Sequence, residues 1–312
     1  MKMRIGIDLG GTNTVVCLCE ENGTLLGKES LPTRTGNPAQ MKADMKQLAL
    51  SLCGMHGAAP DEVTQIGIGV PGSIDRDAVM LMFGTNLRMQ NVCFAEAFQP
   101  EFACPVVLDN DANCAALGEV IAGAGKGCQD AIMVTLGTGV GGGIVIGGRL
   151  YTGANGIAGE IGHMVVAVGG LPCNCGRNGC LEAYASASGM IRLAEMALES
   201  GGESLLRGKR DANGGKLTAK MVCDARDEGD ALAAKVFDMY CMYLGSGLTS
   251  LVNIFQPERI IVGGGVAGYG EKLLRPLREI VARESFQGVH RNTEIVRAEL
   301  GNDAGLIGAA ML

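Results

Sequence analysis

The amino-acid sequence has no block of like charge, no tryptophan and no long apolar stretch that is free of glycine. Its 26 Lys and Arg residues are outnumbered by 33 Asp and Glu residues, and the net charge of −7 argues against nucleic-acid binding through a basic face. With 47% hydrophobic and 19% charged residues, the 312-residue chain has no signature of disorder. We therefore expect a compact soluble protein of one or two domains.

The N-terminal segment MKMRIGIDLGG lacks the apolar core and the small-residue cleavage site of a secretory signal, so we expect a cytoplasmic protein. Residues 131–148 carry no charge, but seven of these eighteen residues are glycine, a poor composition for a membrane helix. We predict two strands and a turn there, and no association with a membrane.

Twelve cysteines in a sequence of this kind favour thiols or a metal site over a disulfide framework. Most of them stand singly among apolar residues and are predicted to be small core residues. These are Cys17, Cys19, Cys53, Cys128, Cys223 and Cys241.

The first part of the sequence predicts strands joined by glycine turns, followed by elements of an α/β fold. The predicted elements are strands over 3–8, 15–19, 24–28, 65–70 and 106–108 and a helix over 38–55. Residues 111–124 are rich in alanine with an acidic first turn, which predicts a helix. Asn110 and Asp111 therefore mark a junction of strand and helix, where α/β sheets bind ligands.

The second half begins with the pattern of the first: an apolar strand over 130–136, the turn Gly137-Thr138-Gly139 and a strand over 143–146. Two similar halves imply two related domains. Further predicted elements are helices over 186–200, 217–253 and 304–312 and a strand over 259–262. The polar segment 201–216 has no apolar period and is predicted to be a surface loop.

Two glycine turns, Gly10-Gly11-Thr12 and Gly137-Thr138-Gly139, are candidates for phosphate binding. A backbone without Cβ atoms can turn several N–H groups toward phosphate oxygens, and each threonine adds a hydroxyl. Neither turn matches a Walker A loop or a GxGxxG motif, and tight hairpins would also need these residues. Asp8 is a candidate either to hold Mg²⁺ through water or to cap its turn. Gly263-Gly264-Gly265 would let an adenine or a ribose approach the backbone closely. Close packing between two elements would need the same glycines.

A Cys₃His set is the strongest local signal. His163, Cys173, Cys175 and Cys180 lie within eighteen residues. Four ligands of this kind close a tetrahedral zinc site without an open position, so we predict a structural zinc and not a catalytic one. The alternative to a metal site is a group of free thiols. A disulfide between Cys173 and Cys175 is disfavoured, because the two residues are too close in sequence.

Two acidic residues flank this cysteine-rich segment: Glu160 precedes His163, and Glu182 follows Cys180. If the segment folds around a metal, both carboxylates are held near one place. Carboxylates around a pocket suit a polyhydroxylated ligand, because they accept hydrogen bonds from hydroxyls in a fixed geometry. Solvated loop acids are the alternative.

Taken together, five motifs resemble the ROK family of sugar kinases and repressors, in the family's order and spacing over essentially the whole chain. The motifs are IGIDLGGT (5–12), GIGVPG (67–72), DNDANCAALGE (109–119), LGTGVGGGIVIGGRLYTGANGIAGEIGH (136–163) and CNCGRNGCLE (173–182). The resemblance implies an actin-like, hexokinase-like (ribonuclease H-like) ATPase fold, in which two α/β domains flank a cleft. We predict a small domain over 1–117 plus 300–312 and a larger domain over 118–299 that carries the zinc site.

The resemblance also implies roles for individual residues. Asp111 would be the general base, and the sugar would be bound by Gly72, Asn110, Asp111, Glu160, His163 and Glu182. One ring nitrogen of His163 would bind zinc while the other faces the sugar. Gly10, Gly11, Thr12, Gly137, Thr138 and Gly139 match the phosphate loops, Gly264 and Gly265 the adenosine side, and Asp8 the acid near the metal-nucleotide.

These roles predict an ATP:hexose 6-phosphotransferase that uses ATP and Mg²⁺ with a structural Zn²⁺. The set of Glu160, His163 and Glu182 resembles glucokinases, so glucose is the expected sugar. Many family members place a tryptophan shortly after an Asn-Leu pair, whereas Asn86-Leu87 is followed here by Arg-Met-Gln. This departure leaves N-acetylmannosamine, fructose, allose or mannose as alternatives.

The repressor branch of the family carries a helix-turn-helix segment ahead of the DLGGT-like strand, where this chain has only MKMR. With its negative net charge, the chain is therefore expected not to bind DNA. A sugar sensor without catalytic activity is a further alternative, which the retained Asp8, Asp111 and both phosphate loops disfavour. Because relatives are often dimers, we expect a homodimer.

Overall fold

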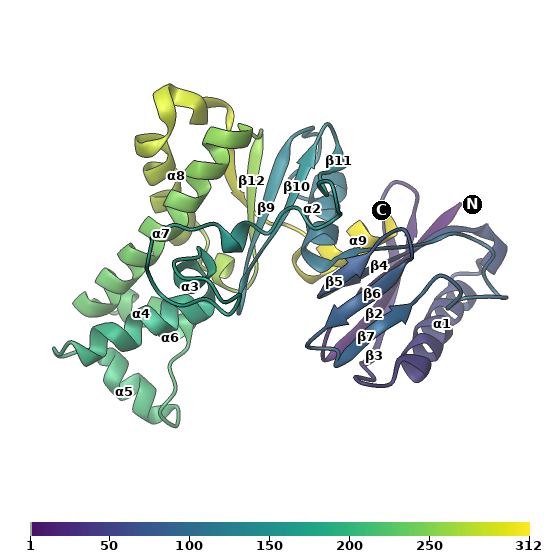
Figure 1. The fold of residues 1–312 in the computed structure, drawn as a ribbon, viewed down its shortest axis with the longest axis horizontal. Helices are drawn as coiled ribbons and strands as arrows, with labels where there is room; N and C mark the ends of the chain where they lie inside the picture. Colours follow the sequence, from purple (N-terminus) through teal and green to yellow (C-terminus); the bar gives the residue numbers. More distant parts are fainter. Residues whose placement is uncertain (1) are drawn as a thin grey trace. The chain divides into compact units, whose positions relative to one another are not determined.

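The computed structural model describes residues 2–312, which form two compact units (Figure 1). Unit 1 comprises the residues up to Met133 together with Gly143–Gly159 and Glu299–Leu312. Unit 2 comprises Val134–Gly142 and Glu160–Ala298. The domains predicted from the sequence, 1–117 plus 300–312 and 118–299, stay a prediction, because compactness alone does not define a domain.

Unit 1 is built on a five-stranded sheet with the strand order β3-β2-β1-β4-β8. The first three strands run antiparallel as successive hairpins, and β4 and β8 run parallel to β1. The strands are β1 (Met3–Leu9), β2 (Asn13–Glu20), β3 (Leu25–Pro32), β4 (Val63–Val70) and β8 (Val106–Asn110). All of the strands predicted for this half are therefore confirmed in position, with small differences at their ends.

Helix α1 (Pro38–Met55), predicted with the same bounds, covers one face of this sheet. Because side chains alternate along a strand, Ile5 and Ile7 of β1 point to the same face. Both are fully buried in the core with Met45 of α1. A second, three-stranded sheet contributes to the same core and was not predicted from the sequence. It consists of the antiparallel strands β5 (Ser73–Asp75), β6 (Met80–Gly84) and β7 (Met89–Cys93).

The opposite face of the sheet is covered by α9 (Ala304–Ala310) and α2 (Asp111–Ala122). Gly6 and Gly67, which pair across β1 and β4, allow α9 to approach the sheet at backbone distance. A Cβ at Gly6 would lie 2.1 Å from the carbonyl oxygen of Leu306, and a Cβ at Gly67 would lie 1.7 Å from that of Ala309. The predicted C-terminal helix is thus confirmed, and its apolar face is buried.

The second five-stranded sheet repeats this topology in the order β11-β10-β9-β12-β13. Its strands are β9 (Ala131–Leu136), β10 (Val140–Ile146), β11 (Arg149–Leu150), β12 (Arg259–Gly263) and β13 (Glu294–Arg297). In this sheet β10 and β11 pair antiparallel and β12 and β13 pair parallel, as β2 with β3 and β4 with β8 do in the first sheet, so the prediction of two similar halves is confirmed.

Helices make up most of unit 2 (Figure 1). They are α3 (Glu182–Ala185), α4 (Ala187–Glu199), α5 (Leu205–Ala212), α6 (Ala219–Asp227), α7 (Ala231–Phe255) and α8 (Glu271–Glu284). Short 3-10 helices occur at η1 (Pro60–Glu62), η2 (Ile161–His163), η3 (Val266–Tyr269), η4 (Phe286–Asn292) and η5 (Gly301–Asp303). The helices predicted over 186–200 and 217–253 are confirmed, the latter as the pair α6 and α7.

The prediction of a surface loop over 201–216 was wrong, because α5 lies inside it. Ser204 caps the helix by accepting a hydrogen bond from the amide of Leu206. Asp230, which is distant in sequence, accepts hydrogen bonds from the Ser204 hydroxyl and the Leu205 amide. Leu206 is fully buried. The helix therefore depends on a contact that the local sequence does not reveal.

The fully buried carboxylate of Glu119 fastens the returning chain to α2. Its Oε2 accepts hydrogen bonds from the amides of Ala124 at 2.8 Å and Glu299 at 3.1 Å, and its Oε1 accepts one from Leu300 at 2.8 Å. Glu299 and Leu300 are the first residues after the chain returns from unit 2. Glu119 thus anchors the segment that leads into α9.

Glu119→Ala is expected to lower the free energy of unfolding by about 3 kcal/mol, because it leaves one buried and two partly buried backbone amides without an acceptor. Glu119→Gln should lower the free energy of unfolding by less, because its side-chain oxygen can still accept a hydrogen bond from a backbone amide. Urea denaturation measures both. The control is Glu299→Ala, which removes an exposed side chain and keeps the backbone amide that Glu119 binds. An equal effect of Glu119→Ala and Glu299→Ala would contradict the anchoring role.

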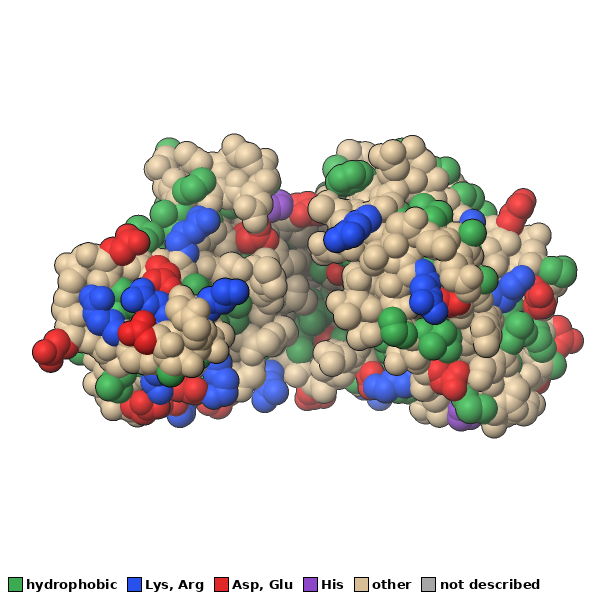
Figure 2. Space-filling model, turned by 90° about the horizontal axis from the view of Figure 1, so that it is seen from below, with side chains coloured by type: hydrophobic (Ala, Val, Ile, Leu, Met, Phe, Trp, Pro, Cys, Tyr) green, Lys and Arg blue, Asp and Glu red, His purple; other side chains and the backbone are tan. Residues whose placement is uncertain are grey.

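The six cysteines predicted to be core residues are all buried. Among residues 2–312, no helix combines the length and the apolar character that a membrane span requires. Figure 2 shows basic and acidic side chains mixed over the face in view.

Candidate active site

The predicted site residues fall into two groups, one in each unit. Unit 1 contains Asp8, Gly10, Gly11, Thr12, Gly72, Asn110 and Asp111. Unit 2 contains Gly137, Thr138, Gly139, Glu160, His163, Cys173, Cys175, Cys180, Glu182, Gly264 and Gly265.

In unit 2, the ligand atoms of His163, Cys173, Cys175 and Cys180 all lie within 4.8 Å of one another. The Sγ atoms of Cys175 and Cys180 are 3.6 Å apart, and the Sγ of Cys173 is 3.7 Å from Nδ1 of His163. A tetrahedron of thiolates with Zn–S bonds of about 2.3 Å has edges of about 3.8 Å. The four side chains therefore fit a zinc ion in both donor type and spacing.

The two ring nitrogens of His163 face different groups. Nδ1 points toward the cysteines, whereas Nε2 lies 3.9 Å from Oε2 of Glu160. Both Glu160 and His163 sit at η2, where a single 3-10 turn places them next to each other. A metal on Nδ1 would fix the ring and leave Nε2 beside the Glu160 carboxylate for a ligand.

Glu182 is the first residue of α3 and lies between the cysteines and the second glycine turn. Its Oε2 accepts a hydrogen bond from the amide of Val140 at 3.0 Å, and its Oε1 lies 3.8 Å from the Sγ of Cys173. A Cβ on Gly139 would come within 2.4 Å of the same carboxylate. The absence of a side chain at 139 therefore lets Glu182 reach the loop backbone.

The Gly137 turn opens into a cavity of about 490 Å³. The turn and β9 form one part of its wall, and α6 and η3 form another. The lining residues are Leu136, Gly137, Thr138, Ala187, Ala219, Lys220, Cys223, Asp224, Gly265, Val266, Gly268 and Tyr269. The volume is in the range of small-molecule and cofactor sites.

The two predicted adenosine-side glycines differ in their surroundings. Gly264 has a φ of +84°, and a Cβ there would lie 2.5 Å from the carbonyl oxygen of Leu136, so the close approach of two strand ends requires this glycine. Gly265 lines the cavity and has open space where a Cβ would stand. Close packing thus accounts for Gly264, while Gly265 is available for a ligand.

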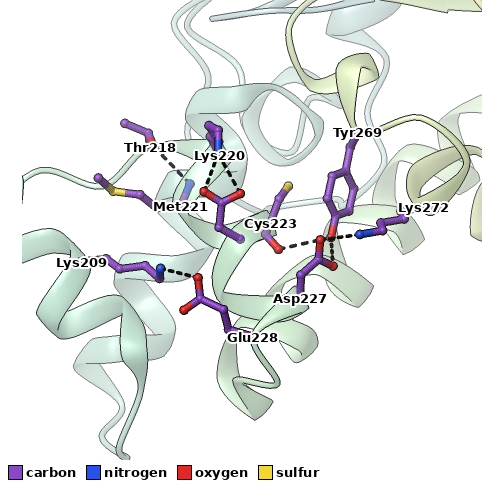
Figure 3. A network of polar contacts seen from close by, with 10 residues as sticks. Lys209, Thr218, Lys220, Met221, Cys223, Asp227, Glu228, Tyr269 and Lys272 are labelled. Atoms are coloured by element: carbon purple, nitrogen blue, oxygen red, sulfur yellow. Dashed lines mark hydrogen bonds and ion pairs between the residues drawn. The ribbon is translucent and has the colours of Figure 1, made fainter.

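Tyr269 at the wall of the cavity is held by a network of polar contacts, part of which Figure 3 shows. Its hydroxyl donates to Asp227, lies 3.2 Å from the carbonyl oxygen of Cys223 and accepts from Nη1 of Arg226 at 3.3 Å. Lys272 binds the other oxygen of Asp227 at 2.6 Å. Burial raises the pKa of Tyr269 to about 12, and its hydrogen bond to Asp227 adds to this. The network fixes the ring in the cavity wall.

Sequence reasoning missed Lys220, Asp224 and Tyr269 as cavity residues. Lys220 and Asp224 form an i, i+4 ion pair at 2.6 Å, a spacing that is also typical of an ordinary exposed helix face. Only the packing of η3 near α6 reveals that they border a cavity.

In unit 1, Asp111 is the first residue of α2 and Asn110 is its N-cap. The side-chain oxygen of Asn110 accepts hydrogen bonds from the amides of Ala112 at 2.9 Å and Asn113 at 3.4 Å. The Asp111 carboxylate accepts one from Ala112 at 2.9 Å. The predicted junction of strand and helix is confirmed, and its capping fixes the position of the Asp111 carboxylate.

The charge of Asp111 acts on the neighbouring carboxyl of Asp8. Burial raises the pKa of Asp8 to about 6, and the charge of Asp111 adds to this increase. Asp111 keeps some exposed surface, yet the protein atoms around it displace enough water to raise its pKa. Hydrogen bonds from Ala112 and Asn110 oppose that increase. Two neighbouring carboxylates with raised pKa values are typical of an acid-base or cation site.

Asp8→Asn is expected to stabilise the metal-free protein at pH 8 by about 2–3 kcal/mol. The folded pKa of about 6 lies above the ordinary value, so the carboxyl destabilises the fold increasingly as the pH rises from 4 to 6. The gain should therefore vanish near pH 4. Urea denaturation without Mg²⁺ or nucleotide measures it, with the exposed Asp77→Asn as control. A gain that is the same at pH 4 and pH 8 would contradict the explanation.

The remaining predicted glycines of unit 1 lie at close contacts. Gly11 packs against Asn86, where a Cβ would be 3.1 Å away. The amide of Gly10 donates to the carbonyl oxygen of Asn13, which closes the β1–β2 turn. Gly72 has a φ of +127° and approaches Phe83 of β6. These contacts explain why glycine stands at positions 11 and 72 and how the β1–β2 turn closes.

Comparison with known proteins places the chain among characterised relatives. A family model described as "ROK family" matches residues 4–312. The glucokinase of Halalkalibacterium halodurans is 40% identical to the chain and aligns with 99% of it and 94% of that protein. A ROK family glucokinase from Streptomyces griseus, solved in complex with glucose and AMPPNP, is 35% identical with a TM-score of 0.77, covering 99% of this chain and 98% of that one. A xylose repressor of Caldicellulosiruptor bescii is 32% identical over 97% of this chain and 76% of its own length.

Proposed function

Since the chain belongs to the ROK family and shares the two-sheet α/β fold of a ROK glucokinase, we propose that it is an ATP-dependent kinase that phosphorylates the 6-hydroxyl of glucose. The observation that supports this most is the carboxylate of Asp111 at the capped start of α2, with Asp8 beside it. A repressor or a sensor has no need of this acidic pair, which has raised pKa values.

The proposed sugar ligands are those that the resemblance to ROK glucokinases indicates. They are Gly72, Asn110, Asp111, Glu160, His163 and Glu182. Their amide, carboxylate and imidazole groups suit hydroxyls. The glucose bound to the S. griseus relative supports a hexose at the corresponding site.

The nucleotide would occupy the cavity of unit 2. The amides of Gly137, Thr138 and Gly139 would face phosphate oxygens, and Gly265 would adjoin the adenosine. Gly10, Gly11 and Thr12 form the corresponding turn in unit 1. Mg²⁺ near Asp8 would neutralise phosphate charge during the reaction.

In the proposed reaction, the oxygen of the sugar 6-hydroxyl attacks the γ-phosphorus of ATP, and its proton passes to Asp111. ADP leaves with the electrons of the broken P–O bond. The raised pKa of Asp111 brings its basicity closer to the working pH than that of an ordinary aspartate. A structural zinc on the Cys₃His set would hold His163 and the residues that flank it in place.

The proposal is tested by measuring ADP release with MgATP and a panel of hexoses: glucose, mannose, fructose, allose and N-acetylmannosamine. Glucose is expected to give the highest kcat/KM, with glucose 6-phosphate as product. A higher kcat/KM for another sugar would correct the substrate and keep the kinase. Sugar binding without turnover of any hexose would overturn the kinase in favour of a sensor.

A further inference from the structure

Arg76 lies in the turn after β5 and reaches the end of strand β8. Its Nε is 2.8 Å from Oδ2 of Asp109, and its Nη2 is 2.6 Å from Oδ1 of the same residue. The pair is bidentate, a geometry in which the planar guanidinium holds the carboxylate in one orientation. No local pattern predicts this pair, because the two residues are 33 positions apart.

Asp109 is almost fully buried and directly precedes Asn110 and Asp111. Its Oδ1 also accepts hydrogen bonds from the amide of Asn110 at 2.7 Å and from Nδ2 of Asn113 at 2.8 Å. One carboxylate thus ties the last residue of β8 to the first turn of α2. Since a buried carboxylate is stable only when it is compensated, its orientation depends on Arg76.

The remaining amino group of the guanidinium engages another segment. Nη1 of Arg76 donates to the carbonyl oxygen of Gly156, which lies between β11 and Glu160. Gly156 has a φ of +83°, and a Cβ there would come within 2.3 Å of Nη1. Arg76 therefore joins three segments of unit 1: the three-stranded sheet β5–β7, the β8–α2 junction and residues 152–159.

We propose that Arg76 is a positioning residue of the phosphoryl-acceptor site: through Asp109, it holds Asn110 and Asp111 in register with the segment that contains Gly156. The inference rests on the proposed function of Asp111 as base. Lysine cannot replace the guanidinium here, because one ammonium group cannot contact both carboxylate oxygens and the Gly156 carbonyl in a planar fork.

The test compares Arg76→Met, Arg76→Lys, Asp109→Asn and the double variant Arg76→Met/Asp109→Asn by steady-state kinetics with MgATP and the sugar that the panel selects. Arg76→Met leaves the buried Asp109 charge unpaired, and kcat is expected to fall about 100-fold. The kcat of Arg76→Lys should lie between that of Arg76→Met and that of the wild type. The KM for MgATP should stay within about threefold of the wild-type value, because the proposed nucleotide cavity lies in unit 2 whereas Arg76 lies in unit 1.

The double variant is the decisive measurement. Its neutral amide in place of the Asp109 carboxylate needs no partner charge and still offers an oxygen to Asn110 and Asn113, so kcat should recover to within about tenfold of the wild type, above either single variant. Arg149→Met is the matched control, because Arg149 is an exposed arginine that lines a separate cavity of unit 1 together with Arg76 and contacts neither Asp109 nor Gly156 in the hydrogen bonds described. It is expected to leave kcat unchanged.

The possible outcomes separate the inference from the function on which it rests. Thermal melts verify that each variant is folded at the assay temperature. A lower melting temperature with unchanged kcat in Arg76→Met, or a double variant no better than the single ones, would overturn the positioning role. A wild-type protein that phosphorylates no hexose would overturn the proposed function instead. If Arg76→Met does not fold, Arg76→Lys and the double variant decide by the same criteria.

Discussion

Asp111→Asn is expected to lower kcat about 10²- to 10⁴-fold, the usual contribution of a general base. Asparagine cannot take up the proton of the attacking hydroxyl, but it keeps the side-chain oxygen that accepts the Ala112 hydrogen bond. The fold and the cap of α2 should therefore persist. Single-turnover phosphoryl transfer measures the loss, and sugar affinity measured by calorimetry should change only a few-fold.

The control for this variant is Asp77→Asn, which changes the same residue type at an exposed position. Its kcat should match that of the wild type. Asp111→Ala extends the test, because it removes the hydrogen-bonding oxygen as well and should also abolish transfer. Turnover of Asp111→Asn within tenfold of the wild type would assign the base to another residue.

Cys180→Ser is expected to remove the metal and with it the sugar site. Cys180 is fully buried, and its Sγ is 3.6 Å from that of Cys175. Because a structural zinc contributes much of the folding energy of its own segment, bound zinc should fall from about one ion per chain to well below this value. The KM for the hexose should rise about 100-fold as His163 and Glu182 lose their fixed positions.

Metal analysis by mass spectrometry and limited proteolysis of the segment 163–180 test this expectation independently of activity. Cys93→Ser is the matched control, because Cys93 is exposed and outside the cluster. It should retain zinc. Full zinc content in Cys180→Ser, or an unchanged KM in a zinc-free sample, would contradict the structural role of the metal.

Local sequence was sufficient wherever one segment determines its own structure. The hairpins of both sheets, α1 and the start of α2 follow from apolar alternation, glycine turns and capping residues within each segment. The Cys₃His cluster was also predictable, because its ligands lie within eighteen residues and a short loop brings them together. These features need no long-range contact to specify them.

Elements that depend on distant partners were missed. α5 needs Asp230 to complete its cap, and β5 to β7 gain their stability by burying residues such as Leu81 in the core of unit 1. The same holds at the site: the pairing of Arg76 with Asp109 and the position of Tyr269 beside α6 arise only when separate segments pack. No local pattern encodes such pairs.

The placement of α9 has a consequence for biosynthesis. The ribosome completes β1 and β4 early, but the helix that covers Gly6 and Gly67 emerges only after all of unit 2. At typical elongation rates of about 5–20 residues per second, this face of the first sheet remains without α9 for roughly ten to fifty seconds. During most of its synthesis, a nascent chain therefore leaves the glycine backbone of this face and its small side chains, such as Cys17 and Cys19, without the helix that packs on them in the folded protein.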